Sequence, residues 1–169
     1  MMAPVRKQKV RSGGAGVTIL FFSLLMAAGA WDVGVRAATT ERVVTDLRTG
    51  LAISGFDPVA YFTNARPTLG REDFESRFAG AIWRFSNPGN RLVFTEHPEV
   101  YMPAFGGYDP VGIARGVAVP GHPRVWLIVG TRLYLFHNDG TRAEFEAGPD
   151  AFILAASRQW SEVKRTLAE

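Results

Sequence analysis

The 169-residue chain has a formal charge of +3 and contains no cysteine. The lack of cysteine excludes disulfides, thiolate nucleophiles, iron–sulfur clusters and cysteine-ligated zinc. The positive charge lies near the N-terminus, where residues 1–37 carry five Lys or Arg and one Asp, so the remainder is nearly balanced and gives no electrostatic basis for binding nucleic acid.

The N-terminal segment has the order of features of an export signal. Four basic residues at positions 6–11 precede an uncharged apolar run at 17–30, and Val35-Arg36-Ala37 is a small-x-small cleavage pattern. The run reaches the roughly 20 residues of a spanning helix only if the weakly apolar positions 12–16 are counted, so we favour a cleaved signal over an uncleaved anchor. We expect residues 1–37 to be a signal peptide and the protein to be periplasmic or secreted, in contact with the membrane only through this segment if it stays uncleaved.

The chain after the signal is long enough for one compact domain. Residues 38–50 are polar and lack a period, which predicts a linker or a loosely docked arm, and residues 51–169 form the domain. Asp57-Pro58 is a turn signal, followed by a short strand or a buried turn at 59–62. Phe74 and Phe78 are spaced i, i+4 among charges, which predicts a short helix over 71–79.

The middle of the chain combines a strand with a capped helix. Residues 81–85 alternate as a strand does, and Asn87-Pro88 supplies an N-cap and an N1 proline for a helix that ends at Pro98. Residues 99–102 add at most one further helical turn.

The C-terminal part predicts a hairpin and a final helix. Residues 125–129 and 133–136 are rich in β-branched and aromatic side chains and flank a tight turn. Gly148-Pro149-Asp150 caps a last helix with apolar residues at helical spacing. The expected fold class is α+β, a small antiparallel sheet with packed helices, with one core in which four aromatic side chains meet: Trp83, Phe94, Trp126 and Trp160.

Two short stretches of the chain are alike. Gly55-Phe-Asp-Pro-Val and Gly107-Tyr-Asp-Pro-Val are identical at four of five positions. The match is too short to establish a duplication, but it suggests two similar turns.

Several motifs occur in the order found in one family. They are Gly55-Phe-Asp-Pro-Val-Ala-Tyr-Phe62, Trp83-x-Phe85, Asn90-Arg91 with Phe94, Pro98-Glu99-x-Tyr101-x-Pro103 and Phe105-Gly-Gly-Tyr108. In this respect the chain resembles the exported, single-domain type of YHS-domain protein over most of its length after residue 50. The resemblance implies a YHS-like fold and a metal-binding role. It also implies a cysteine after Gly-Gly-Tyr, where this chain has Asp109.

A metal site without cysteine would depend on histidines and carboxylates. The candidate ligands are Asp109, Asp57, His137 and His97, and the cofactor, if there is one, is a divalent metal ion of unknown identity. Asp57 and Asp109 also have a structural interpretation, because an Asp before Pro can hold a turn by accepting backbone N–H groups. On that interpretation Asn at position 109 should be tolerated, and Cys there should raise the affinity for zinc or copper.

No enzyme signature is present. The serines lack a nucleophile-elbow context and no His-Glu-x-x-His occurs, so we expect a non-catalytic binding domain. The alternatives are a metal-free module for a protein partner or small ligand, with a pocket lined by Tyr61, Tyr108 and Trp126, and an acid–base hydrolase using Asp57 and Asp109. The partner itself is not predicted.

Overall fold

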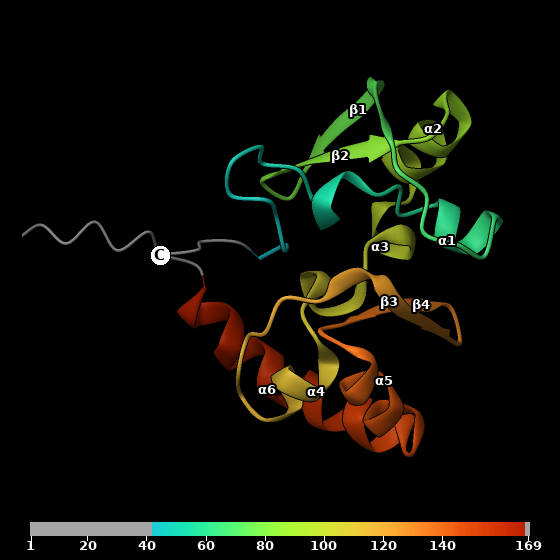
Figure 1. The fold of residues 1–169 in the computed structure, drawn as a ribbon. Helices are drawn as coiled ribbons and strands as arrows, with labels where there is room; N and C mark the ends of the chain where they lie inside the picture. Colours follow the sequence, from blue (N-terminus) through green and yellow to red (C-terminus); the bar gives the residue numbers. More distant parts are fainter. Residues whose placement is uncertain (1–41, 168–169) are drawn as a thin grey trace, which may run out of the picture. The chain divides into compact units, whose positions relative to one another are not determined.

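The structure is a computed structural model that describes residues 42–167 (Figure 1). The predicted signal peptide, residues 1–37, lies outside the described residues, as does the start of the predicted linker. No helix within the described part is long and apolar enough to cross a membrane. The elements in chain order are η1 (Ile53–Gly55), α1 (Ala60–Thr63), β1 (Arg71–Phe78), β2 (Ala81–Phe85), α2 (Pro88–Glu96), α3 (Pro98–Tyr101), η2 (Ala104–Gly107), α4 (Pro110–Ala114), β3 (His122–Val129), β4 (Arg132–Phe136), α5 (Asp139–Glu146) and α6 (Pro149–Thr166).

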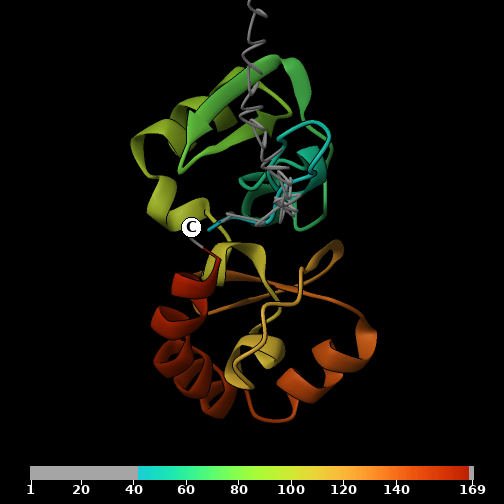
Figure 2. The ribbon, with the colours of Figure 1, turned by 90° about the vertical axis from the view of Figure 1, so that its left-hand side faces the viewer.

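The α+β class is confirmed, but the strands form two sheets rather than one. β1 pairs with β2, and β3 pairs with β4, both antiparallel and both two-stranded. Each hairpin is followed by a helix, α2 after the first and α5 after the second (Figure 2). Two-stranded sheets are marginal alone, so each hairpin depends on the helices and loops that pack on it.

The predicted helix over 71–79 is wrong, because this segment is strand β1. Phe74 and Phe78 are four residues apart, and residues at i and i+4 share a face in a strand as well as in a helix. The charged residues between them point to solvent, and β1 is exposed along most of its length. Of the two predictions for residues 59–62, a short strand or a buried turn, the second is confirmed: buried Val59 leads into α1, a helix of four residues.

The helix boundaries that rest on capping signals are confirmed. The Asn87 side chain accepts from the N–H of Asn90, with Pro88 at the first position of α2. Gly148 and Pro149 open α6. Helix α5 was not predicted, although Asn138 forms a capping box with Thr141 at its start.

The two short similar stretches belong to a structural repeat that covers most of the described chain. We call residues 53–101 the first repeat and residues 104–166 the second. In both, a 3-10 turn and an Asp-Pro-Val segment lead into a short helix and then into a hairpin with a bulge after its first pair. An Asn-capped helix follows the hairpin, and after it comes a second helix that begins with proline. The pairs Ser76↔Trp83 and Leu127↔Tyr134 occupy the same place in the two hairpins.

Backbone geometry supports the repeat. Each 3-10 turn contains three consecutive residues with positive φ, namely Ile53, Ser54 and Gly55 (43°, 56° and 77°) and Phe105, Gly106 and Gly107 (53°, 65° and 89°). Positive φ is uncommon for a non-glycine residue and is strained for a β-branched one such as Ile53. The same rare conformation at the same place in both repeats therefore reflects one shared turn design.

The main core cluster contains residues from both repeats. Trp83, Phe85 and Phe94 of the first repeat are fully buried together with Leu133 and Leu135 of the second. Trp126 packs against this cluster, as predicted. Trp160 does not, because it lies on α6 and packs instead with Tyr108, Ile113 and Ala156 in a separate cluster.

The predicted linker needs correction in its second half. Val43 is 2% exposed and belongs to the main core cluster. The Val44 N–H donates to the Gly106 carbonyl, and the Val44 carbonyl accepts from the Ile53 N–H. Residues 42–50 are thus docked against the 3-10 turns of both repeats, which fits the predicted docked arm rather than a free linker.

Candidate functional site

Asp57 lies at the turn between η1 and α1 in the first repeat and is fully buried. One carboxylate oxygen accepts from the N–H groups of Val59 (2.9 Å) and Ala60 (3.3 Å). The other accepts from the Ser86 N–H, the Ser86 hydroxyl and the Asn90 side-chain amide, each at 2.7 Å. Asp57 therefore ties the helix that follows it to the start of α2, beyond the hairpin.

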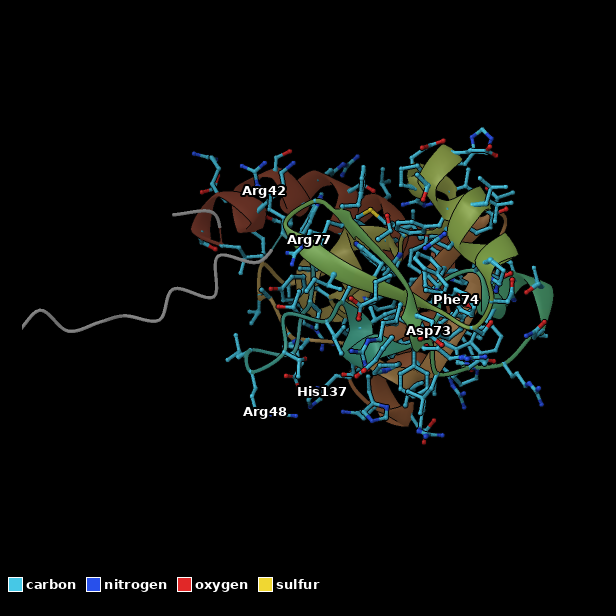
Figure 3. All side chains as sticks on the ribbon, turned by 90° about the horizontal axis from the view of Figure 1, so that it is seen from above. Arg42, Arg48, Asp73, Phe74, Arg77 and His137 are labelled. Carbon is cyan, nitrogen blue, oxygen red and sulfur yellow. The ribbon has the colours of Figure 1, made fainter. Side chains whose placement is uncertain are left out.

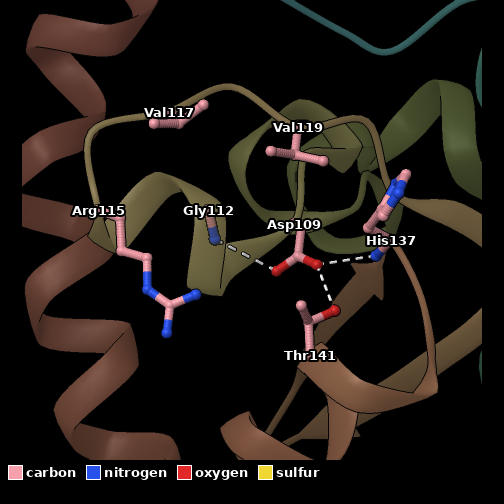
Figure 4. Close-up of a pocket in the computed structure, with 7 residues that line it drawn as sticks. All are labelled: Asp109, Gly112, Arg115, Val117, Val119, His137 and Thr141. Carbon is pink, nitrogen blue, oxygen red and sulfur yellow. Dashed lines mark hydrogen bonds between the residues drawn. The ribbon is translucent and has the colours of Figure 1, made fainter.

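Asp109 occupies the same place in the second repeat and is 1% exposed. One oxygen accepts from the N–H groups of Val111 (2.8 Å) and Gly112 (3.4 Å), which caps α4. The other accepts from the His137 N–H (2.8 Å) and the Thr141 hydroxyl (2.5 Å), as Figure 4 shows in part. In this geometry both aspartates hold their turns by accepting backbone N–H groups, as the structural interpretation of the two Asp-Pro turns expects.

A cavity of about 290 Å³ lies beside Asp109 (Figure 4). Its wall is mostly apolar, formed by Val117, Val119 and the backbone of Gly112, with Arg115 and His137 among the polar residues that line it. The Arg115 guanidinium is paired with Glu144. This volume is at the small end of ligand pockets in proteins, so the cavity suits a compact molecule.

The predicted metal ligands do not assemble. His137 and Asp109 line the same cavity, but it is the His137 backbone that contacts the carboxylate, while its Nδ1 lies 3.2 Å from the Pro120 carbonyl. His97 lies between α2 and α3 with its side chain 63% exposed, and its nearest carboxylate is that of Glu99 at 3.7 Å. Within residues 42–167, Asp57 and Asp109 share no hydrogen-bond partner.

The residues present therefore do not fit a transition-metal site. Within residues 42–167, no three His, Asp or Glu side chains come together in a way that could hold a metal ion. The oxygens of Asp109 are already engaged by four donors, and moving them to a metal would leave buried N–H groups unpaired, which is costly.

The predicted aromatic pocket is not formed. Tyr61 and Trp126 are in edge-to-face contact with centroids 5.3 Å apart, but Tyr108 packs against Trp160 in a different cluster. Tyr61 is buried and its hydroxyl donates to the Pro123 carbonyl at 2.7 Å. Burial, and then the negative charge of Asp57, raise the pKa of Tyr61 well above its ordinary value, while Arg124 opposes this shift. Tyr61 is a neutral structural donor.

Sequence reasoning missed the distant partners of the two carboxylates: Ser86, Asn90 and Thr141. The sequence does contain a signal for these partners. Ser86-Asn87 and His137-Asn138 occupy equivalent positions after the two hairpins, and Asn90 and Thr141 each follow three residues after the Asn. Aligning the two repeats beyond the Asp-Pro-Val motif would have found it.

Comparison of the chain with protein-family models, with curated proteins and with solved structures found no match.

Proposed function

We propose that this protein is an exported, non-catalytic YHS-like binding domain that takes a compact, largely apolar ligand in the cavity beside Asp109, without a transition metal. The observation that carries the proposal is the cavity of about 290 Å³ with valine side chains in its wall. The motif order from Gly55 to Tyr108 supports the YHS-like part.

The proposal does not include metal binding, because Asp109 is not a soft ligand and its oxygens are already hydrogen-bonded. It replaces the soft thiolate that the resemblance implies, and soft ligands are what select copper(I) and strengthen zinc binding. One of its oxygens caps helix α4 and the other accepts from His137 and Thr141 after the second hairpin, so the carboxylate holds the wall of the cavity in place. Asp109 is a positioning residue in this proposal.

The two other candidate functions have less support. A hydrolase that uses Asp57 and Asp109 as acid and base needs both carboxylates at one substrate, yet each is saturated within its own repeat. A protein-interaction module is favoured by a contiguous apolar patch, and the large apolar side chains exposed in the described part, such as Leu47 and Leu92, come from different segments of the chain.

Export rests on the N-terminal segment. Its basic residues, apolar run and Ala37 pattern support a signal that is removed, leaving a chain that begins near Ala38. The intact mass of the protein recovered after expression with its own N-terminus decides between the two forms: a full-length mass in the membrane fraction would favour an uncleaved anchor.

The ligand cavity is tested by a titration followed by ¹H–¹⁵N NMR, with indole as the probe. We expect saturable shifts of the amides of Gly112, Val119 and Thr141, and loss of these shifts in Val117→Trp, where the larger ring fills the cavity. Leu154→Trp is the matched control, because Val117 and Leu154 are both 54% exposed and only Val117 lines the cavity. Unsaturable shifts, or equal binding by Val117→Trp, would rule out this site.

A further inference from the structure

A second cavity, of about 360 Å³, has a different chemical character. Its walls come from the start of the described chain, the turn of the first hairpin, the segment around η2, the start of β4 and the end of α6. Three cationic side chains line it: Arg42, Arg132 and Lys164. Arg42 is labelled over α6 in Figure 3, in keeping with a shared wall with Lys164.

These three cations are not neutralised by the described part of the protein. None of them forms a salt bridge within residues 42–167, whereas Arg71, Arg84, Arg115, Arg142 and Arg165 all do. Arg132 donates one N–H to the backbone carbonyl of Glu99, which orients its guanidinium and leaves further donors. Glu99 also lines the cavity, and its carboxylate lies 3.7 Å from Nδ1 of His97.

Arg132 and Lys164 are also half-buried rather than fully solvated. A cation in this situation loses part of its hydration, and no carboxylate within residues 42–167 pairs with it, which favours the entry of an anion. Arginine is well suited to this task because its planar fork can hold a carboxylate with two N–H groups.

Apart from Glu99, the rest of the wall is apolar or backbone. Phe105 and Trp160 meet edge to face with centroids 5.9 Å apart, and Phe78 is 41% exposed at the hairpin turn. Met102 and Pro103 add further apolar surface. An apolar wall next to uncompensated cations fits a ligand with a negative head and an apolar body.

We propose that this cavity binds a small organic anion, a carboxylate attached to an aromatic or short acyl body. The site is separate from the cavity beside Asp109 and does not depend on it. Arg132 and Lys164 bind the carboxylate, and Phe78, Phe105 and Trp160 contact the body.

The probe is 4-phenylbutyrate, compared with 4-phenylbutanamide, which has nearly the same shape without the charge. In an NMR titration of the full chain we expect a saturable shift of the Trp160 indole N–H with the carboxylate and at least about tenfold weaker binding of the amide. Arg132→Gln and Lys164→Gln should each weaken carboxylate binding by about tenfold. Arg158→Gln, an exposed position of α6 outside the cavity wall, should bind as the natural protein does.

Salt provides a second test that needs no variant. Raising the salt to about 1 M should weaken binding of the carboxylate but not of the amide, because it screens exposed and half-exposed charges. Equal affinities for carboxylate and amide, or unchanged affinity in both glutamine variants, would overturn the proposal. So would shifts at Gly112 and Val119 with none at Trp160, since these would place the anion in the other cavity.

Discussion

Asp57 and Asp109 perform the same structural task in the two repeats. Each carboxylate uses one oxygen to cap the helix that follows it and the other to hold the backbone at the end of the next hairpin. The second oxygen changes what can be expected of substitutions. Asn offers one carbonyl oxygen, but three backbone N–H groups, those of Val111, Gly112 and His137, donate to the two oxygens of Asp109. This geometry argues against the expectation from sequence that Asn would be tolerated at 109.

We predict that Asp109→Asn lowers the free energy of unfolding by about 1–3 kcal/mol, because the new amide NH₂ faces the His137 N–H. Asp57→Asn should have a similar cost, because its amide would face the Ser86 N–H. Reversible denaturant unfolding measures both.

The matched control is Asp73→Asn, which changes an exposed surface pair with Arg71 and should cost less than about 1 kcal/mol. If Asp109→Asn were as stable as this control, the proposed role of the second oxygen would be wrong.

Half of each carboxylate network could be predicted from sequence. An Asp before Pro predicts a local helix cap, because the N–H group that it accepts, that of Val111, is only two residues from Asp109. Its tie to His137 crosses 28 residues and depends on how the hairpin folds back, which no local pattern encodes.

At the scale of elements, close backbone approach fixes where each hairpin begins. The Gly121 N–H donates to the Gly107 carbonyl, and the Gly70 N–H donates to the Gly55 carbonyl, so the glycine before each hairpin lies against the 3-10 turn of its own repeat. A Cβ on Gly121 would lie 2.6 Å from the Gly107 oxygen and 2.7 Å from the Leu135 Cβ. A Cβ on Gly70 would lie 2.5 Å from two atoms of Arg84.

Gly121→Ala and Gly70→Ala should therefore each cost about 1–3 kcal/mol, because backbone atoms must shift to admit the methyl group. Gly148→Ala serves as the control, since a Cβ there meets nothing within 4 Å. Thermal unfolding of the three variants provides the comparison, and a Gly121→Ala protein that is no less stable than the control would contradict the close approach.

The elements that sequence predicted best were those with chemical end signals. Asn87-Pro88 and Gly148-Pro149 marked the helix starts because caps act within a few residues. Strand β1 is predicted as a helix because it is exposed on both faces, so its sequence lacks the alternation of apolar and polar residues that indicates a strand. The sheet count was also wrong, since strand pairing between distant hairpins is decided by tertiary packing.

At the scale of the whole molecule, contacts join the two repeats. The main core cluster includes Trp83 and Leu133, and the Tyr61 hydroxyl of the first repeat bonds to the Pro123 carbonyl of the second. The similarity between Gly55–Val59 and Gly107–Val111 predicts only two similar turns. The full repeat was not visible because the hairpins share a fold and a register but few residue identities.

Tyr61 gives the protein a specific sensitivity to alkali. The pKa of Tyr61 is raised in the folded state, so the stabilisation that Tyr61 provides is fully present below the ordinary tyrosine pKa of 10.0. This stabilisation is lost as the pH rises above that value, because Tyr61 ionises in the unfolded chain while it stays neutral in the folded chain. We predict that Tyr61→Phe loses about 1–3 kcal/mol near neutral pH by leaving the Pro123 carbonyl unpaired. The gap to the natural protein should narrow above pH 10, and unfolding measured at pH 7 and pH 11 checks this. An unchanged gap would contradict the buried, neutral state of Tyr61.

The central claim is that Asp109 holds structure and that binding is independent of transition metals. Calorimetric titration of Zn²⁺ and Cu²⁺ into the natural protein and into Asp109→Cys tests it most directly. We predict no tight stoichiometric binding by the natural protein and a measurable gain in the Cys variant, since thiolate is the stronger ligand and His137 lines the same cavity. Tight one-to-one binding by the natural protein that Asp109→Asn abolishes would contradict the claim and make Asp109 a metal ligand.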